Sequence, residues 1–219
     1  MLPIGVLASG GGTNLQSIID EIEAGTLKAE IKLVLSDKAD AYALTRAAKH
    51  NIPTLVITKG EYPDRADFDE AAANALKKNG VELVVLAGFM RLLSKSFLEA
   101  FPERIINIHP SLLPAFPGLN VQKKALAKGV KFSGCTVHFV DEGLDSGPVI
   151  NQAVVPVLSS DTVDTLSKRI LEREHKLYPE AIRYFAEERV TVNGRQVKIK
   201  DAPEPDREIF NPSLSEEKK

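Results

Sequence analysis

The sequence predicts an α/β fold in which a mostly parallel sheet is flanked by helices on both faces and gains an antiparallel or mixed extension in the C-terminal third. Short apolar runs alternate with helical patterns up to about residue 110, and two longer apolar runs follow residue 130. With 43% hydrophobic residues, the 219-residue chain can bury one substantial core. We therefore expect one domain over residues 1–200, with halves at about 1–100 and 101–200, and a tail at 201–219.

Five short runs rich in Val, Ile and Leu have the character of buried strands: Ile4–Ala8, Ile31–Leu35, Thr54–Ile57, Leu83–Ala87 and Ile105–Ile108. Apolar residues at helical spacing fill the gaps, at Leu15, Ile18, Ile19 and Ile22 and then within Ala41–Lys49, Asp67–Lys78 and Ser96–Phe101. A strand followed by a helix, repeated, requires right-handed crossovers between parallel strands. This order predicts a Rossmann-like sheet.

The pattern changes in the C-terminal third. Ser133–Val140 and Val149–Val157 are typical of longer strands, and the glycine-rich segment Asp141–Pro148 separates them. Asp161 and Asp164 then open a helix. These features predict the antiparallel or mixed extension and a final helix beside it.

The end of the chain carries two breaker signals and a tail. We expect Pro179 to break or kink the final helix. Asn193-Gly194, between Arg189–Val192 and Gln196–Ile199, predicts a short β-hairpin. The tail from Asp201 is rich in proline and charge, and we expect it to be loosely attached or disordered.

Composition and charge exclude several classes of function. The 28 basic and 30 acidic residues nearly cancel, so the chain lacks the broad positive field that binds nucleic acids. It has no signal-peptide pattern and no apolar stretch long enough to cross a bilayer. Cys135 is the only cysteine, which we expect to be a buried thiol, and the four histidines lack metal-ligand spacing. We expect a cytoplasmic protein without a metal, and both monomer and homodimer stay open.

A glycine loop follows the first predicted strand and precedes the first helix. Three consecutive glycines, Gly10–Gly12, allow a tight turn and a close approach of the backbone to a ligand, and the helix start attracts an anion. A phosphate fits this site. The loop lacks the lysine of a P-loop and the spacing of a dinucleotide fingerprint. The alternative is a plain turn in which Ser9 and Thr13 cap the helix.

Two polar side chains, Asn107 and His109, leave the end of the fifth predicted strand together. Residues two apart face the same side of a strand, so an amide and an imidazole can converge on one atom. Such a pair suits stabilisation of an oxyanion on a carbonyl under attack. Each residue alone is more typical of a structural role, but prolines at 110 and 114 stiffen the following loop and favour the functional interpretation.

An acidic loop at residues 141–148 is the third candidate. A carboxylate there could orient an imidazole or accept a proton through water, although the segment taken alone favours an ordinary turn with solvated acids. His138 alternates within the preceding apolar strand and could support such a site or form its wall.

Taken together, these segments resemble the phosphoribosylglycinamide formyltransferases, folate-dependent enzymes of purine synthesis. The resemblance covers about residues 2–188 and is carried by Ser9–Leu15, Ala87–Arg91, Asn107–Pro114, Phe116–Leu119 and Gly143–Pro148. A wider group that includes methionyl-tRNA formyltransferase and formyltetrahydrofolate deformylase shares the Asn-x-His and Leu-Asp-x-Gly elements. These elements therefore identify the chemistry better than the substrate.

The resemblance implies roles for matching positions. Asn107, His109 and Asp145 correspond to a catalytic trio. The phosphate and ribose of the ribonucleotide would lie at Gly12, Thr13, Asn14, Arg65 and Glu174. The reduced folate, 10-formyltetrahydrofolate, would be bound by Met90, Arg91, Leu93, Val140, Asp141, Glu142, Gly143 and Leu144. The implied reaction moves its formyl group to the amine of phosphoribosylglycinamide, with no metal and with small molecules as the only partners.

Three alternatives differ in what they leave unexplained. The transfer-RNA formyltransferase and the deformylase usually carry a further domain, and only a hairpin and a tail follow residue 188 here. Near-neutral charge also argues against a transfer-RNA substrate. A non-catalytic module that binds a nucleotide through residues 9–14 would leave the other segments without a role.

Overall fold

A computed structural model describes residues 1–58, 60–62 and 64–203, so most of the predicted tail lies outside the described residues. The elements in chain order are β1 (Leu2–Leu7), α1 (Thr13–Glu23), β2 (Ala29–Ser36), α2 (Tyr42–Lys49), β3 (Thr54–Val56), α3 (Arg65–Lys78), β4 (Leu83–Leu86), α4 (Lys95–Ala100), β5 (Ile105–His109), α5 (Val121–Lys128), β6 (Phe132–Phe139), β7 (Val149–Pro156), α6 (Val163–Ala186), β8 (Val190–Asn193) and β9 (Gln196–Ile199).

Strands β1 to β7 form one sheet in the order β3-β2-β1-β4-β5-β6-β7. The five strands from β3 to β5 in this order are parallel, whereas β6 runs antiparallel to both β5 and β7. This arrangement confirms the predicted fold class, including the extension in the C-terminal third. Because β2 and β3 lie on one side of β1 and β4 and β5 on the other, the strand order reverses at β1, which is where open parallel sheets bind ligands.

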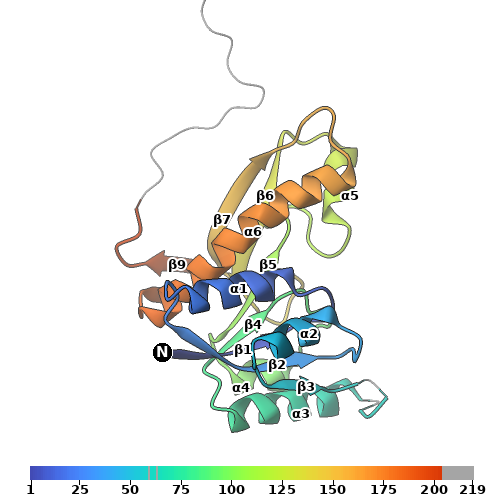
Figure 1. The fold of residues 1–219 in the computed structure, drawn as a ribbon. Coiled ribbons are helices and arrows are strands. Elements are labelled where there is room, and N and C mark those ends of the chain that lie inside the picture. The colour runs from blue at the N-terminus through green and yellow to red at the C-terminus, as the bar shows by residue number, and fades with distance from the viewer. Residues whose placement is uncertain (59, 63, 204–219) are drawn as a thin grey trace, which may run out of the picture.

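Helices cover both faces of the sheet (Figure 1). Residues of α1, α2 and α6 form one core with inward side chains such as Ile4, Val6 and Val85. Residues of α3 and α4 form the second core with the alternate residues, such as Val84 and Leu86. The strands are therefore buried on both sides, which is why their sequences are continuously apolar.

The predicted break at Pro179 does not occur, because α6 continues through this residue to Ala186. Proline removes one backbone hydrogen bond, which costs stability in a helix interior. Tyr178, Ala181, Ile182 and Phe185 are buried in the first core, so packing offsets that loss. Its N-terminus is capped by Thr162 and Thr165, which form a capping box, and Asp164 lies in the first turn.

Two further local differences have physical reasons. Helix α5 was not predicted, because only Val121 and Ala125 of its eight residues are buried and its apolar stripe is therefore weak. The predicted hairpin exists as β8 and β9, but Asn193 pairs with Gln196, so its turn is Gly194-Arg195 rather than Asn193-Gly194.

Among the described residues, none of the helices combines the length and apolar character that crossing a bilayer requires.

Candidate active site

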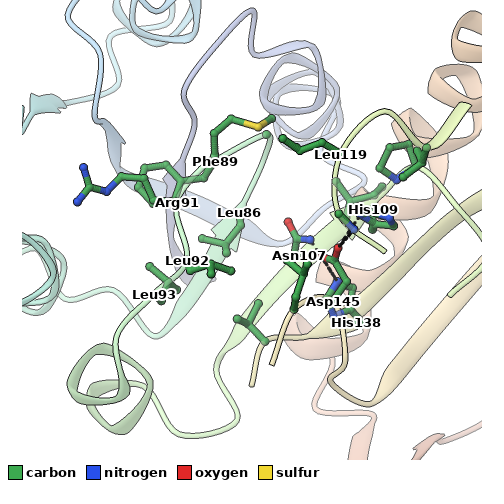
Figure 2. A pocket seen from close by; sticks show the side chains of 18 of the residues that line it. Leu86, Phe89, Arg91, Leu92, Leu93, Asn107, His109, Leu119, His138 and Asp145 are labelled. Atoms are coloured by element: carbon green, nitrogen blue, oxygen red, sulfur yellow. Dashed lines mark hydrogen bonds and ion pairs between the residues drawn. The ribbon is translucent and has the colours of Figure 1, made fainter. Parts of the chain in front are cut away.

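A pocket with a cavity volume of about 650 Å³ opens at the carboxyl ends of β4 and β5. Figure 2 shows two unlike sides of it. We call Asn107, His109, His138 and Asp145 the polar wall, and Leu86, Phe89, Met90, Leu92 and Leu93 the apolar wall. Because Leu86 and Asn107 are register partners in adjacent parallel strands, the ends of β4 and β5 place the two walls side by side.

The pocket brings together most of the residues singled out in the sequence. Its lining includes the three candidate catalytic residues, His138, and the eight candidate folate residues Met90, Arg91, Leu93, Val140, Asp141, Glu142, Gly143 and Leu144. Asn14 and Glu174 also line it. Gly12 and Thr13 precede Asn14 at the start of α1 and are not part of the lining.

Cross-strand pairing fixes the orientation of Asn107. Its register partner in the antiparallel strand β6 is His138, and the Asn107 Nδ2 atom lies 3.1 Å from His138 Nε2. His138 Nδ1 donates to the carbonyl of Phe139 at 2.7 Å, so Nε2 of the neutral ring is the acceptor for the Asn107 amide. Burial lowers the pKa of His138, which favours this neutral form, although the Phe139 hydrogen bond and the Asp145 charge oppose the shift.

His109 is held at both ring nitrogens. Nε2 lies 3.0 Å from the carbonyl oxygen of Phe116, and Nδ1 lies 3.4 Å from Asp145 Oδ2. A carbonyl accepts, so Nε2 donates to Phe116, and the contact of Nδ1 with Asp145 is an ion pair when the ring is protonated. The side chains of His109 and Asp145 are 7% and 13% exposed, which strengthens the interaction between their charges.

Asp145 is fixed by its backbone and by a neighbouring loop. Its φ of 50° lies in the left-handed region, which Asp tolerates better than most residues. Its Oδ2 also accepts the backbone N–H of Gly118 at 2.7 Å. The loop that carries it is tied internally by Ser146, which donates to Asp141 at 2.6 Å, and externally by Arg195, which donates to the carbonyl of Ser146 at 2.6 Å.

The apolar wall is held through its backbone. Ser9 Oγ accepts the N–H of Met90 at 3.0 Å, and Asp69, a fully buried carboxylate on α3, accepts the N–H of Ser94 at 2.5 Å. Arg65 donates to the carbonyl of Leu93. Arg65, which the resemblance implied for the phosphate region, thus contacts the apolar wall and forms an ion pair with Asp69.

Glu174 of α6 meets Asn14 of α1 at the edge of the pocket. The Asn14 amide donates to Glu174 Oε2 at 2.8 Å, which joins two residues 160 positions apart in the chain. Burial raises the pKa of the Glu174 carboxyl, while the hydrogen bond from Asn14 partly lowers it. The Asn14 Oδ1 atom is buried without a partner in the described part of the chain, so this pair has a free acceptor beside the pocket.

The glycine loop is built around Gly12. Its φ of 67° and ψ of 33° favour glycine, and a Cβ atom there would lie 2.8 Å from the Cα of Ala43. Gly12 is the N-cap of α1 and provides no side-chain cap, so neither Ser9 nor Thr13 serves as the helix cap, and Ser9 instead bonds to Met90.

Sequence reasoning missed several contributors to the pocket. Asn120, Val121 and Gln122, at the N-cap and start of α5, line it, as does Leu92. The Phe116 carbonyl that holds His109 is also in this segment. The prolines at 114 and 117 indicate a stiff loop but do not predict which residues that loop contacts. Phe116, Gly118 and Asn120 all have positive φ values in this segment, and at Phe116 the sequence carries no signal for such a backbone.

The fold and pocket define an α/β protein with a small-molecule site whose polar wall suits a carbonyl substrate. The formyl transferase family model matches residues 3–182, and the chain belongs to that family. A solved structure, glycinamide ribonucleotide transformylase 1 from Symbiobacterium toebii, is 55% identical with a TM-score of 0.90 and covers 92% of this chain and 95% of its own.

Curated relatives agree with this family. Phosphoribosylglycinamide formyltransferase from Haemophilus influenzae is 42% identical over 190 residues, which are 87% of this chain and 90% of that protein. The trifunctional purine biosynthetic protein adenosine-3 of Chironomus tentans is 46% identical over 194 residues. The match is 88% of this chain but only 14% of that much longer relative. The resemblance inferred from the motifs is thus confirmed.

Proposed function

We propose that the protein transfers the formyl group of 10-formyltetrahydrofolate to the amine of phosphoribosylglycinamide, giving formylphosphoribosylglycinamide and tetrahydrofolate in purine biosynthesis. The observation that carries this proposal is the convergence of Asn107, His109 and Asp145 on one pocket that also has an apolar wall. The relatives named phosphoribosylglycinamide formyltransferase support the same assignment.

The chemistry follows from the polar wall. The substrate amine attacks the formyl carbon, a C–N bond forms, and the carbonyl oxygen becomes an oxyanion. Asn107 donates a hydrogen bond to that oxygen, because His138 accepts one N–H and leaves the other for the ligand. The positive charge of His109, paired with Asp145, adds electrostatic stabilisation at the same place.

Asp145 also serves the proton transfer. Collapse of the tetrahedral intermediate breaks the bond between the formyl carbon and the folate nitrogen. The attacking nitrogen must lose a proton and the leaving nitrogen must gain one. A water held by the Asp145 carboxylate carries that proton between them. No step in this sequence uses a metal.

The two ligands occupy different ends of the pocket. The reduced folate lies against the apolar wall and residues 140–144, where planar rings gain apolar contact and the main chain reads the pterin. The ribonucleotide lies toward Asn14 and Glu174, with its phosphate at the N–H groups of residues 12–14 and its ribose hydroxyls at the Glu174 carboxylate. Arg65 supports the folate end through Leu93.

The remaining assignments belong to the same proposal. The protein acts in the cytoplasm as a single domain over residues 1–200, as a monomer or homodimer, on small molecules rather than nucleic acids or membranes. The nearly balanced charge of 28 basic and 30 acidic residues supports the exclusion of nucleic acids.

The test is a spectrophotometric assay of deformylation with 10-formyltetrahydrofolate, or its dideaza analogue, and three acceptors. Deformylation that depends on phosphoribosylglycinamide is the expected result. Release with water alone would instead indicate a deformylase, and release only with methionyl-tRNA would indicate a transfer-RNA formyltransferase. No release with any acceptor would overturn the proposed enzyme and favour a binding module.

A further inference from the structure

Arg46 on α2 contacts both the glycine loop and α1. Its Nε donates to the carbonyl oxygen of Gly11 at 2.8 Å, and its Nη1 donates to Gln16 Oε1 at 3.1 Å, in the first turns of α1. The guanidinium carbon also lies 5.0 Å from the centre of the Tyr42 ring. Arg46 therefore joins the loop, the helix that follows it and its own helix.

The carbonyl groups of the loop are all directed at the protein. Gly10 accepts the N–H of Ala43 at 3.0 Å, Gly11 accepts from Arg46, and Gly12 accepts the N–H of Gln16 at 3.0 Å. In a trans peptide, the carbonyl of one residue and the N–H of the next point in opposite directions. The contact with Arg46 therefore sets the direction of the Gly12 N–H.

Arginine is well suited to hold the Gly11 carbonyl, because its charge does not depend on pH in the working range. A guanidinium stays charged at all relevant pH values, so its bond to a carbonyl is charge-assisted. His175 faces the same region: burial and, to a smaller extent, the charge of Arg46 lower its pKa, which favours the neutral ring. The carboxylate of Asp20 faces the same region and raises that pKa only in part. His50 lies 3.2 Å from Gln16 Nε2, and Lys49 lies over the Tyr42 ring, but Arg46 is the basic residue bonded to Gly11.

We propose that Arg46 is a positioning residue for the substrate phosphate: by holding the Gly11 carbonyl, it keeps the loop N–H groups aimed at the anion and sets the preference for a phosphorylated acceptor. The inference rests on the proposed function, because the anion is the phosphate of the acceptor. It explains how the loop recognises a phosphate without the lysine of a P-loop.

The experiment compares Arg46→Ala with the parent enzyme on two acceptors, phosphoribosylglycinamide and its dephosphorylated ribonucleoside. We expect kcat/KM for the phosphorylated acceptor to fall about tenfold, mainly through KM, because one charge-assisted hydrogen bond is lost. The value for the ribonucleoside stays within about twofold, since no phosphate is present to misalign. Equal losses on both acceptors, or no loss on either, would overturn the proposal.

Lys49→Ala is the matched control. Lys49 is one helical turn further along α2 and lies over the same Tyr42 ring at 5.8 Å, so the variant also removes a cation from this surface. We expect its preference between the two acceptors to equal that of the parent. Arg46→Lys keeps the charge and one donor, and we expect it to recover most of the loss. A control variant as impaired as Arg46→Ala would show that general surface charge is responsible.

Direct binding separates this inference from the enzyme assignment. Calorimetric titration with ribose 5-phosphate, with ribose as the blank, measures the loop without any turnover. We expect the dissociation constant to rise about tenfold in Arg46→Ala. If the parent has no activity on phosphoribosylglycinamide, but the dissociation constant is still about tenfold higher in Arg46→Ala than in the parent, the proposed function fails while the role of Arg46 stands. If the parent and variant bind equally, the role of Arg46 fails whatever the activity.

Discussion

The two walls of the pocket differ in how they are held. On the polar wall, His109 and His138 are 5% and 2% exposed, and each is fixed at both ring nitrogens by neighbouring groups. On the apolar wall, Met90 and Leu92 are 64% and 56% exposed, and the wall is anchored through backbone groups, the N–H of Met90 and the carbonyl of Leu93. Groups that stabilise charge must be in place before the ligand arrives, whereas a binding surface gains its energy when the ligand covers it.

The largest expected effect tests the polar wall. Asp145→Asn removes the charge that faces His109 and the proposed proton relay, and we expect kcat to fall about 100-fold to 10,000-fold. Asn107→Ala removes one donor to the oxyanion, for a loss of about 100-fold to 1,000-fold. In both variants, the dissociation constant of a folate analogue stays nearly unchanged, as fluorescence titration would show. Parent-like turnover in either variant removes that residue from the mechanism.

A smaller effect of the opposite kind tests the apolar wall. Leu92→Ser removes apolar surface that the folate covers in the proposed function, so we expect KM for the folate to rise about fivefold while kcat barely changes. Leu158→Ser is the control, because Leu158 is 46% exposed and is not among the residues that line the pocket. A drop in kcat rather than a rise in KM would contradict the separation between the walls.

The smallest expected effect concerns stability and pH at His138. Burial lowers its pKa from the ordinary value of 6.5, so the folded protein prefers the neutral ring. The resulting contribution to stability is complete above pH 6.5 and is lost as the pH falls through the lower folded pKa. Urea unfolding at several pH values should show that the parent loses more stability below pH 6.5 than His138→Gln does. If stability falls by the same amount with pH in both proteins, the His138 ring is not held neutral. His175, whose pKa burial also lowers, is present in both proteins and therefore does not affect the comparison.

Much of the fold could be predicted because strands that are buried on both faces of the sheet have continuously apolar sequences. Strands such as Leu83–Leu86 are continuously apolar, and the change to longer runs after residue 130 marks the antiparallel strands. The helix α5 could not be predicted because its apolar stripe is weak, and the continuation through Pro179 could not because it depends on packing of α6 against distant residues.

The candidate site was predictable in its residues but not in its connections. The spacing of Asn107 and His109 indicated a shared face, and both line the pocket. The hydrogen bond from Asn107 to His138 depends on the register of two antiparallel strands, which no spacing within either strand reveals. The contact of Arg65 with Leu93 likewise depends on how α3 packs under a loop 28 residues away in the chain.

Cys135, the only cysteine, is fully buried, and burial together with the Glu174 charge raises the pKa of its thiol to about 12. Thiol reagents require the thiolate, so they will leave the native chain almost untouched. A single cysteine introduced on the surface can then be labelled selectively, and Cys135 does not have to be replaced first. At Lys198, on the hairpin whose turn holds Ser146 through Arg195, a fluorophore would report on movements of the Asp145 loop from outside the pocket.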